Sequence, residues 1–352
     1  MKKLLPLIFL FLLLFAKNPS AQLTLNANGP GNTYELITSK LAPNYNPIEV
    51  PDCGHSVFGR HIDEVFDAEL NDHVFRFLIH VEEDDDRCIN FDRQRNEIKT
   101  YDQSPDSLLG TEGEIVEYKW KFKLDAGHQS SPKFTHIHQL KAVGGTEASM
   151  PLITLTTRSG TPEELELRYA ETTTAVELHA VDLAPFKGTW CEVTETVTYG
   201  ESGSYNIIIK KISDNSMMFS YSNNDIRMWK TEAEFIRPKW GIYRSLQFVS
   251  DLRDEEVLFA NFSIEELSIN LTDNFLSTTT KIQLFPNPTF DSIQILGTNK
   301  NLFFEIFSST GIKIQEGYIS NNQLSLSTLP NAIYFLKLHI GNKTLTKRIV
   351  KK

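Results

Sequence analysis

Apolar and polar residues alternate along much of the chain with the two-residue period of a β-strand. The clearest run is EIVEYKWKFKL, in which Val116, Tyr118 and Trp120 fall on one face and Glu117 and Lys119 on the other. Such alternation predicts a half-buried antiparallel strand. Similar patterns occur in HVFRFLIHV, PLITLTTRS, ELELRYA, SYNIIIKKI and VLFANFSI. Since no helical pattern is comparably long, we expect an all-β protein built as a jelly-roll sandwich.

The most apolar stretch is the N-terminus, MKKLLPLIFLFLLLFAKNPSAQ. Lys2 and Lys3 precede an apolar run from Leu4 to Phe15, and a small-residue cleavage site ends at Ala21. This pattern predicts a signal peptide over residues 1–21 and not a membrane span. No later apolar run approaches the length of a membrane span, so we expect a secreted protein with no span.

Length, charge and cysteine content narrow the function further. The chain has 352 residues, enough for one large or two smaller domains. Its formal net charge of -10 argues against nucleic acid as a partner. Secretion permits a disulfide, and Cys53 with Cys88 is the preferred pair, which leaves Cys191 unpaired.

The composition of the sequence shifts to polar residues and threonines near SINLTDNFLSTTTKIQ. We therefore predict a jelly-roll domain over residues 22–268, a linker over 269–281 and a small immunoglobulin-like β-sandwich over 282–352. The FPNP motif at 285–288, the STG turn at 309–311 and the lysine-rich end resemble the C-terminal sorting domain of the type IX secretion system. That resemblance implies transport by the type IX machinery to the cell surface or the medium.

The segment RQRNEIKTY places Arg93, Arg95, Glu97 and Lys99 on one face of a strand. A face with three cations and one carboxylate suits an anionic ligand. The alternative is a solvated outer face, which is the usual meaning of a charge run.

In FTHIHQLKAVGG, strand alternation puts His136 and His138 on one face and Ile137 on the other. Gln139 and Lys141 point with Ile137 unless a bulge redirects them. Two histidines on one face can address a single ligand. Because no third metal ligand is evident, we expect no metal site there.

The segment RPKWGIYRS places Lys239, Gly241 and Tyr243 on one face, with Trp240 and Ile242 on the other. A cation and a phenol then lie side by side with no side chain between them. The alternative is an edge strand with solvated charges.

Together these segments offer arginine, histidine, lysine and tyrosine on strands that a concave sheet can bring together. That set suits β-elimination at a uronic acid. Cations must neutralise the carboxylate while charge builds up, a base must remove the C5 proton, and an acid must protonate the departing O4. When the proton and O4 lie on the same side of the ring, one tyrosine can fill both roles. When they lie on opposite sides, histidine and tyrosine can divide them.

The three segments resemble strands of the jelly-roll polysaccharide lyases. Residues 95–98 (RNEI), 136–138 (HIH) and 238–244 (PKWGIYR) are similar to the family 7 alginate lyases. The wider stretches CGHSVFGRHI, DDDRCINFDRQRNEIKTYDQSP, FTHIHQLKAVGG and FIRPKWGIYRS look more like the ulvan lyases of polysaccharide lyase family 28, over about residues 45–268. This resemblance implies a concanavalin-like lyase fold and cleavage of ulvan, a sulfated rhamnose–uronate polymer, at 4-linked glucuronate or iduronate.

The resemblance also implies roles for individual residues. Tyr243 would be the acid, and also the base in a same-side elimination. His138 would be the base or a partner of the carboxylate. Arg95, His136 and Lys239 would hold the carboxylate or the neighbouring sugar. Further basic residues available to bind the polymer are Arg93, Lys99, Arg237 and Arg244. Gln139 and Lys141 are second choices, which apply if a register shift turns them to the face of His136.

Other functions remain open from the sequence. The same sandwich could be a lyase of glucuronan or alginate, or a glycan-binding module without catalysis. A glycoside hydrolase would need two carboxylates across the bond, and the cations around Glu97 make it a poor acid. The acidic run VEEDDDRC could bind a structural calcium ion, although a solvated loop is the preferred interpretation. We otherwise expect no cofactor, a monomer, and structural or surface roles for His55, His61, His73, His80, His128 and His179.

Overall fold

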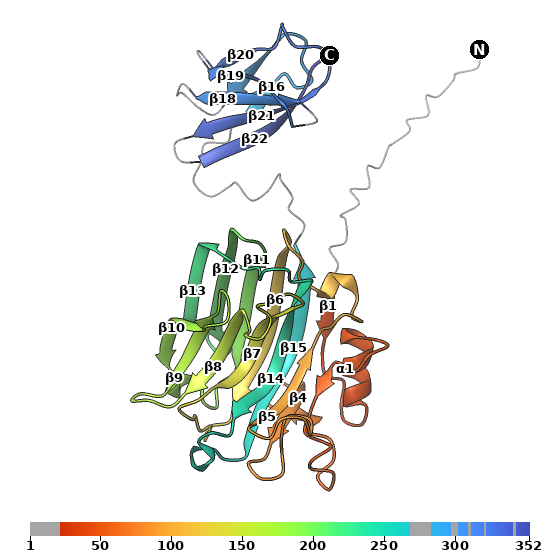
Figure 1. Cartoon of the computed structure of the whole chain (residues 1–352), viewed down its shortest axis with the longest axis vertical. Coiled ribbons are helices and arrows are strands. Elements are labelled where there is room, and N and C mark those ends of the chain that lie inside the picture. The colour runs from red at the N-terminus through yellow and green to blue at the C-terminus, as the bar shows by residue number, and fades with distance from the viewer. Residues whose placement is uncertain (1–21, 268–282, 297–301, 309–310, 320–321, 341–342) are drawn as a thin grey trace, which may run out of the picture. The chain divides into compact units, whose positions relative to one another are not determined.

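The computed structural model describes residues 22–267, 283–296, 302–308, 311–319, 322–340 and 343–352. It divides into two compact units, Met1–Ile269 and Asn270–Lys352 (Figure 1). The predicted signal peptide and the predicted linker lie outside the described residues, so they stay predictions. In the part of the chain that the structure describes, no helix is long and apolar enough to span a membrane.

The first unit is a sandwich of two antiparallel sheets (Figure 1). The eight-stranded sheet runs β13 (Met217–Ile226), β12 (Gly203–Lys211), β11 (Cys191–Thr198), β6 (Ile115–Leu124), β15 (Glu255–Glu266), β4 (Asp72–Ile79) and β3 (Ile62–Asp67), with β1 (Gln22–Leu25) also paired to β15. The seven-stranded sheet runs β10 (Val176–Asp182), β9 (Glu164–Tyr169), β8 (Ile153–Arg158), β7 (Thr135–Val143), β14 (Phe235–Ser245), β5 (Arg93–Lys99) and β2 (Ile48–Glu49). This architecture confirms the predicted all-β sandwich.

The hydrophobic core lies between the two sheets and follows the alternation of the sequence. On β6, Tyr118 and Trp120 are buried while Lys119 between them is exposed. Their rings meet Trp240 of β14 in the facing sheet, with centroids 6.5 and 6.0 Å apart. Aromatic burial of this kind is among the largest contributions to a core. The core-facing side chains of β14, Trp240 above all, therefore hold this strand in place.

Helical structure in the first unit is short. It consists of α1 (Thr33–Leu41) and the single turns η1 (Asp106–Leu108), η2 (Ala184–Phe186) and η3 (Val249–Asp251). The Cys53–Cys88 disulfide predicted from the sequence is confirmed, and Cys191 is free and buried in the core.

The second unit is a smaller sandwich. One sheet contains β16 (Gln283–Phe285), β17 (Ser292–Leu296) and β20 (Gln323–Ser325). The other contains β19 (Lys313–Tyr318), β18 (Phe303–Ser308), β21 (Ile333–Ile340) and β22 (Lys343–Val350). Buried residues from both sheets, among them Ile293, Ile306 and Leu336, form its own core. The predicted second β-sandwich is therefore also confirmed.

Candidate active site

A β-bulge between β7 and β14 decides which side chains share the outer face of the seven-stranded sheet. Tyr243 pairs with His136, whereas Lys239 pairs with Gln139, so β14 carries one more residue than β7 over this stretch. Gly241 lies in the bulge with φ +142°, and a Cβ there would be 2.0 Å from the carbonyl oxygen of Asn96. Only glycine permits this close approach of the two backbones.

The bulge corrects the face predicted for β7. His136, Gln139 and Lys141 line the same cleft, as the alternative register in the sequence allowed. His138 lies on the core side, contrary to the prediction that it shares a face with His136. A one-residue slip moves every following side chain to the other face, which is the physical reason for the error.

His138 cannot contact a ligand in the cleft. Its Nε2 lies 2.9 Å from a carboxylate oxygen of Glu195, and its Nδ1 lies 3.0 Å from the carbonyl oxygen of Lys239. The ring packs against Trp120 and Trp240, with centroids 4.3 and 5.7 Å away. The predicted role of His138 as a base or carboxylate partner is therefore wrong.

Arg244 is also buried away from the cleft. Its Nε donates to Oε1 of Gln94 at 2.7 Å and its Nη1 to the carbonyl oxygen of Arg253 at 2.8 Å. Because it follows Tyr243 directly, strand alternation turns it to the other face. The prediction that Arg244 binds the polymer is wrong.

The other predicted site residues gather around one cleft of about 530 Å³. They are Arg93, Arg95, Lys99, His136, Gln139, Lys141, Arg237, Lys239 and Tyr243. The interpretation of RQRNEIKTY as a solvated outer face is excluded for Arg95 and Lys99, which are buried. The cleft thus combines side chains from β5, β7 and β14, three neighbouring strands.

Three of these residues form a lateral row across the sheet. Arg95 of β5 pairs with Tyr243 of β14, and Tyr243 pairs in turn with His136 of β7. The Arg95 guanidinium lies over the Tyr243 ring, 3.7 Å from its centroid, and Arg93 donates a hydrogen bond of 2.9 Å to the Tyr243 hydroxyl. Two cations therefore orient a half-buried phenol.

His136 lies beside Tyr243 as a neutral imidazole. Burial lowers its pKa to about 3, and the positive charges of Arg158 and Arg95 act in the same direction. Its Nδ1 is buried and has no hydrogen-bond partner among the described residues. The ring stacks on Phe134 at 5.0 Å, which holds it in place. His136 therefore lines the cleft as an uncharged ring with one nitrogen that no described residue satisfies.

Beneath the cleft lies an ion network that the sequence did not reveal. Glu49 contacts Lys239 Nζ at 2.5 Å and Lys99 Nζ at 2.9 Å, while Glu97 contacts Lys239 Nζ at 2.7 Å. Arg95 also bonds to Glu97, and its Nε donates to Asp86 at 2.8 Å. Glu49 comes from β2, which has two residues and shows no alternation that could have marked it.

The network keeps both glutamates ionised. Burial alone would raise the pKa of each carboxyl, but the charges of Lys239 and Arg95 outweigh it and hold the pKa of Glu49 and Glu97 below the usual range. Lys239 is consequently engaged by carboxylates at the floor of the cleft. Its predicted contact with a substrate carboxylate would have to compete with these two ion pairs.

Two cations at one end of the cleft have no such partners. Lys141 and Arg237 are paired across β7 and β14, and neither forms an ion pair with a carboxylate among the described residues. Burial lowers the pKa of Lys141 to about 8, assisted by the charges of Lys239 and Arg95. Arg237 lies over the Tyr101 ring at 4.4 Å, and its Nε and Nη1 are buried without hydrogen-bond partners. The two side chains can therefore bind an anion at this end of the cleft.

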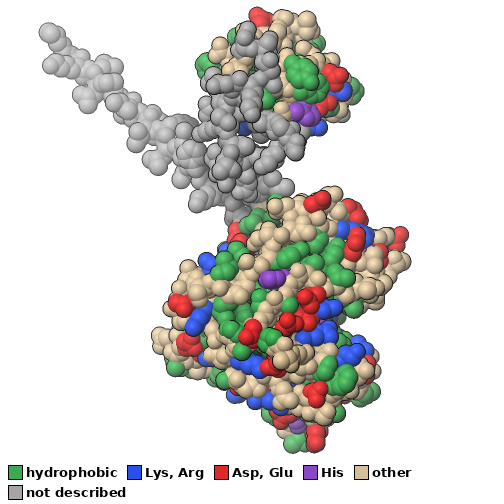
Figure 2. Space-filling view, turned by 90° about the vertical axis from the view of Figure 1, so that its left-hand side faces the viewer, with side chains coloured by type: hydrophobic (Ala, Val, Ile, Leu, Met, Phe, Trp, Pro, Cys, Tyr) green, Lys and Arg blue, Asp and Glu red, His purple; other side chains and the backbone are tan. Residues whose placement is uncertain are grey.

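The positive cleft contrasts with the net negative charge of the chain. Figure 2 shows one side of the first unit, on which acidic and basic side chains are interspersed in small groups. Lys141 and Arg237 therefore give their end of the cleft a local positive charge in a chain that is acidic as a whole.

The acidic run also differs from the prediction. Glu82 and Glu83 are exposed, as a solvated loop predicts, but Asp84, Asp85 and Asp86 are buried, so that expectation is wrong for the three aspartates. Their carboxylates point to different partners: Asp84 to histidines, Asp85 to the backbone of Cys88, and Asp86 to Arg95. His55, His61 and His80, which showed no partners in the sequence, surround Asp84.

Comparison with known families identifies the second unit. Residues 283–352 match the family described as the secretion system C-terminal sorting domain. The chain carries a secretion-system sorting domain. Such a domain implies secretion to the extracellular space or the cell surface, in agreement with the sequence prediction. No curated protein sequence matches the chain.

Among solved structures the chain resembles several lyases in its arrangement of strands. An endo-β-1,4-glucuronan lyase from the fungus Trichoderma reesei has 14% identity and a TM-score of 0.43, over 58% of this chain and 87% of that one. The PL-14 alginate lyase from Aplysia kurodai has 14% identity and a TM-score of 0.47, over 69% and 98%. Alginate lyase A1-II′, a member of polysaccharide lyase family 7, has 13% identity and a TM-score of 0.43, over 62% and 93%.

Proposed function

We propose that the first unit is a polysaccharide lyase that cleaves a uronate-containing polymer by β-elimination, and that the polymer is ulvan. The observation that carries this proposal is the row Arg95–Tyr243–His136 in a positively charged cleft. It supplies a proton-transferring phenol, cations for the developing charge and a neutral hydrogen-bonding imidazole, which are the groups that the reaction needs.

In the proposed reaction Tyr243 carries out both proton transfers. Its oxygen, as the phenolate, takes the C5 proton of the uronate, the C4–O4 bond breaks, and a C4=C5 double bond forms. The phenol then gives that proton to the departing O4. Arg93 and Arg95 stabilise the negative charge on the phenol oxygen, since one donates to it and the other covers the ring.

The exclusion of His138 from the cleft affects the stereochemistry. A single residue reaches both the C5 proton and O4 when they lie on one side of the sugar ring, as in glucuronate. In iduronate they lie on opposite sides and a second group is needed. His136 has a pKa of about 3 and is a weak base near neutral pH, so we assign it to hydrogen bonding with the uronate. The site therefore favours glucuronate.

Lys141 and Arg237 support a polymer with charge on more than one sugar. His136 and Lys141 are separated along β7 by roughly 15 Å of extended strand. An anion bound by Lys141 and Arg237 would therefore belong to a sugar other than the one undergoing elimination. Ulvan offers sulfate on rhamnose next to each uronate, and glucuronan and alginate offer further carboxylates.

The cleft does not provide for hydrolysis. Glycoside hydrolysis needs one carboxyl group that is protonated and a second that is ionised across the bond. Among the described residues Glu49 is the carboxylate that lines the cleft, and Glu97 lies beneath it. Both are bound to cations that lower their pKa, so neither can act as the acid.

The test is ultraviolet absorbance of the secreted protein mixed separately with ulvan, glucuronan, alginate and heparin. Elimination creates a conjugated unsaturated uronate that absorbs, whereas hydrolysis and binding do not. We expect a rise with ulvan, its loss in Tyr243→Phe, and wild-type rates in Tyr221→Phe, a control on β13 of the other sheet. A rise with glucuronan or alginate alone would keep the reaction and overturn ulvan.

Binding must be measured alongside turnover to separate a lyase from a glycan-binding module. The Tyr243→Phe variant should retain polymer binding, since it lacks one hydroxyl and keeps every cation. Binding without an absorbance change in the wild type, for all four polymers, would favour the glycan-binding module and overturn the lyase.

A further inference from the structure

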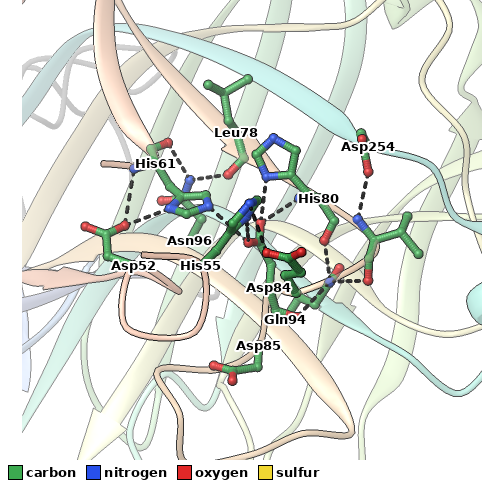
Figure 3. A network of polar contacts seen from close by, with 12 residues as sticks. Asp52, His55, His61, Leu78, His80, Asp84, Asp85, Gln94, Asn96 and Asp254 are labelled. Atoms are coloured by element: carbon green, nitrogen blue, oxygen red, sulfur yellow. Dashed lines mark hydrogen bonds and ion pairs between the residues drawn. The ribbon is translucent and has the colours of Figure 1, made fainter. Parts of the chain in front are cut away.

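Three histidines and one aspartate converge outside the cleft, near the end of β4 (Figure 3). His55 and His61 precede β3, His80 follows β4, and Asp84 lies in the next turn. One side-chain donor atom from each of the four lies within 4.8 Å of all the others. Oδ1 of Asp84 is 2.9 Å from Nδ1 of His55 and 3.0 Å from Nε2 of His61, and its Oδ2 is 3.1 Å from Nδ1 of His80.

His61 lies between two carboxylates, one on each ring nitrogen. Its Nδ1 lies 2.7 Å from Asp52, and its Nε2 faces Asp84. A neutral imidazole has one N–H, so it can donate to one of these carboxylates and not to both. If Nδ1–H donates to Asp52, the Nε2 lone pair faces the Asp84 oxygen. A protonated ring donates to both carboxylates, and, against the effect of burial, Asp52 and Asp84 raise the pKa of His61 to about 9. A metal ion can take the place of the Nε2 proton, with Asp52 behind the ring as the carboxylate that usually supports a ligating histidine.

We propose that His55, His61, His80 and Asp84 bind a zinc ion. Three imidazole nitrogens and one carboxylate oxygen are a ligand set that zinc prefers, whereas calcium requires six to eight oxygens. Tetrahedral zinc with bonds of about 2.0–2.1 Å places its donor atoms about 3.3 Å apart. The three contacts to Asp84 need to lengthen by only a few tenths of an ångström to reach that spacing, whereas donor atoms that lie further apart, within 4.8 Å, need to approach one another.

The surroundings of the cluster fit a closed metal site with an entry path. His61 and Asp84 are fully buried, and the Phe58 ring packs on His61 and His80 with centroids 4.7 and 4.3 Å away. His55 and His80 also line an open hollow at the surface, through which an ion can enter. Four protein ligands leave no open position for a substrate, so the zinc has a structural role.

The cluster is tied to the wall of the cleft through the residues that follow it. Nε2 of Gln94 donates to the carbonyl oxygen of Asp84 at 2.9 Å, and the amide of Asn96 donates to that of His61 at 2.8 Å. Both side chains belong to β5, whose opposite face carries Arg95. Asp86, two residues after Asp84, bonds directly to Arg95. Zinc would thereby fix the strand that positions the cations of the cleft.

The first experiment measures zinc by mass spectrometry in the full-length secreted protein purified without a histidine tag. We expect about one zinc per chain in the wild type and in His73→Ala, a control on β4 whose histidine lies outside the cluster. His55→Ala should contain at least tenfold less. His55 is partly exposed beside the hollow, so its replacement is the least damaging to the fold.

Thermal unfolding gives a second readout that does not depend on activity. Removal of zinc with a chelator should lower the Tm of the wild type and of His73→Ala, zinc added back should restore it, and His55→Ala should respond to neither. Wild-type protein that contains no zinc and shows no Tm change when zinc is added would overturn the proposal. Zinc retained at full stoichiometry by His55→Ala would also overturn it, because the ion would then lie elsewhere.

Discussion

Arg95 and Tyr243 lie opposite each other on the antiparallel strands β5 and β14, with the guanidinium 3.7 Å from the centre of the phenol ring. The arginine is itself held from below by Asp86 and Glu97. This stacking fixes the plane of the ring, and the hydrogen bond from Arg93 fixes the position of its oxygen. The strand register therefore sets the geometry of the proposed proton transfer.

Replacing Arg93 by Gln should reduce kcat by on the order of a hundredfold, because it removes the charged donor to the Tyr243 oxygen. KM should change little, since the other cations of the cleft remain. Arg76→Gln is the control, because it removes an arginine on β4 of the eight-stranded sheet that is paired with Asp63. Initial rates from ultraviolet absorbance give both constants, and an Arg93→Gln enzyme with wild-type kcat would exclude this role of Arg93.

Replacing Gly241 by Ala should destabilise the protein by about 3 kcal/mol or more, because the new Cβ would collide with the backbone of Asn96. Gly113→Ala is a matched control: Gly113 also has a positive φ, but a Cβ added there would meet no atom within 4 Å. It should lose about 1 kcal/mol. Chemical denaturation compares the two, and equal losses would show that the bulge tolerates a side chain.

Replacing His138 by Gln should lower stability by about 1–3 kcal/mol, because Glu195 loses a buried partner. Its kcat should stay within a few-fold of the wild type, since His138 faces the core. Tyr243→Phe should show the reverse, with normal stability and no turnover. A His138→Gln protein that is fully stable and inactive would restore His138 to the active site.

The KM for the polymer should rise as the pH passes about 8. The pKa of Lys141 is lowered to about 8 by burial and by neighbouring cations, so its ammonium form, which attracts the anionic polymer, is lost above that pH and present below it. Lys141→Arg keeps its charge and should flatten the rise. KM values for both proteins between neutral and moderately alkaline pH provide the measurement, and a wild-type KM that does not change with pH would contradict the prediction.

Replacing both Cys53 and Cys88 by Ser should cost about 4 kcal/mol, since the disulfide closes a loop with a sequence separation of 35 residues. A reducing agent should lower the stability of the wild type to that of the double variant and leave the double variant unchanged. Cys191→Ala removes the free cysteine and should keep the response to reduction. A double variant as stable as the oxidised wild type would show that the loop is held by its polar contacts alone.

Local alternation in the sequence was sufficient for much of this protein. It predicted the β-sandwich, and it placed Arg93, Arg95 and Lys99 on one face of β5 and Lys239 and Tyr243 on one face of β14. These predictions succeeded because the face of a side chain on a regular strand depends on its parity alone. The motifs of the C-terminal segment likewise predicted its sorting domain, since they are short and contiguous.

Tertiary structure decided the features that strand alternation cannot predict, namely the register between strands and the contacts between distant loops. The register of β7 shifts against both of its neighbours, β14 and β8, and this shift puts Gln139 in the cleft and His138 in the core. Gly241 lies at the shift, where its backbone also approaches that of β5. Glu49 enters the ion network from a strand too short to show a pattern. The convergence of His55, His61, His80 and Asp84 depends on how β3 and β4 pair and on where their flanking loops fold. Sequence alone specified the faces of regular strands, whereas the register between strands and the meeting of distant loops required the packed fold.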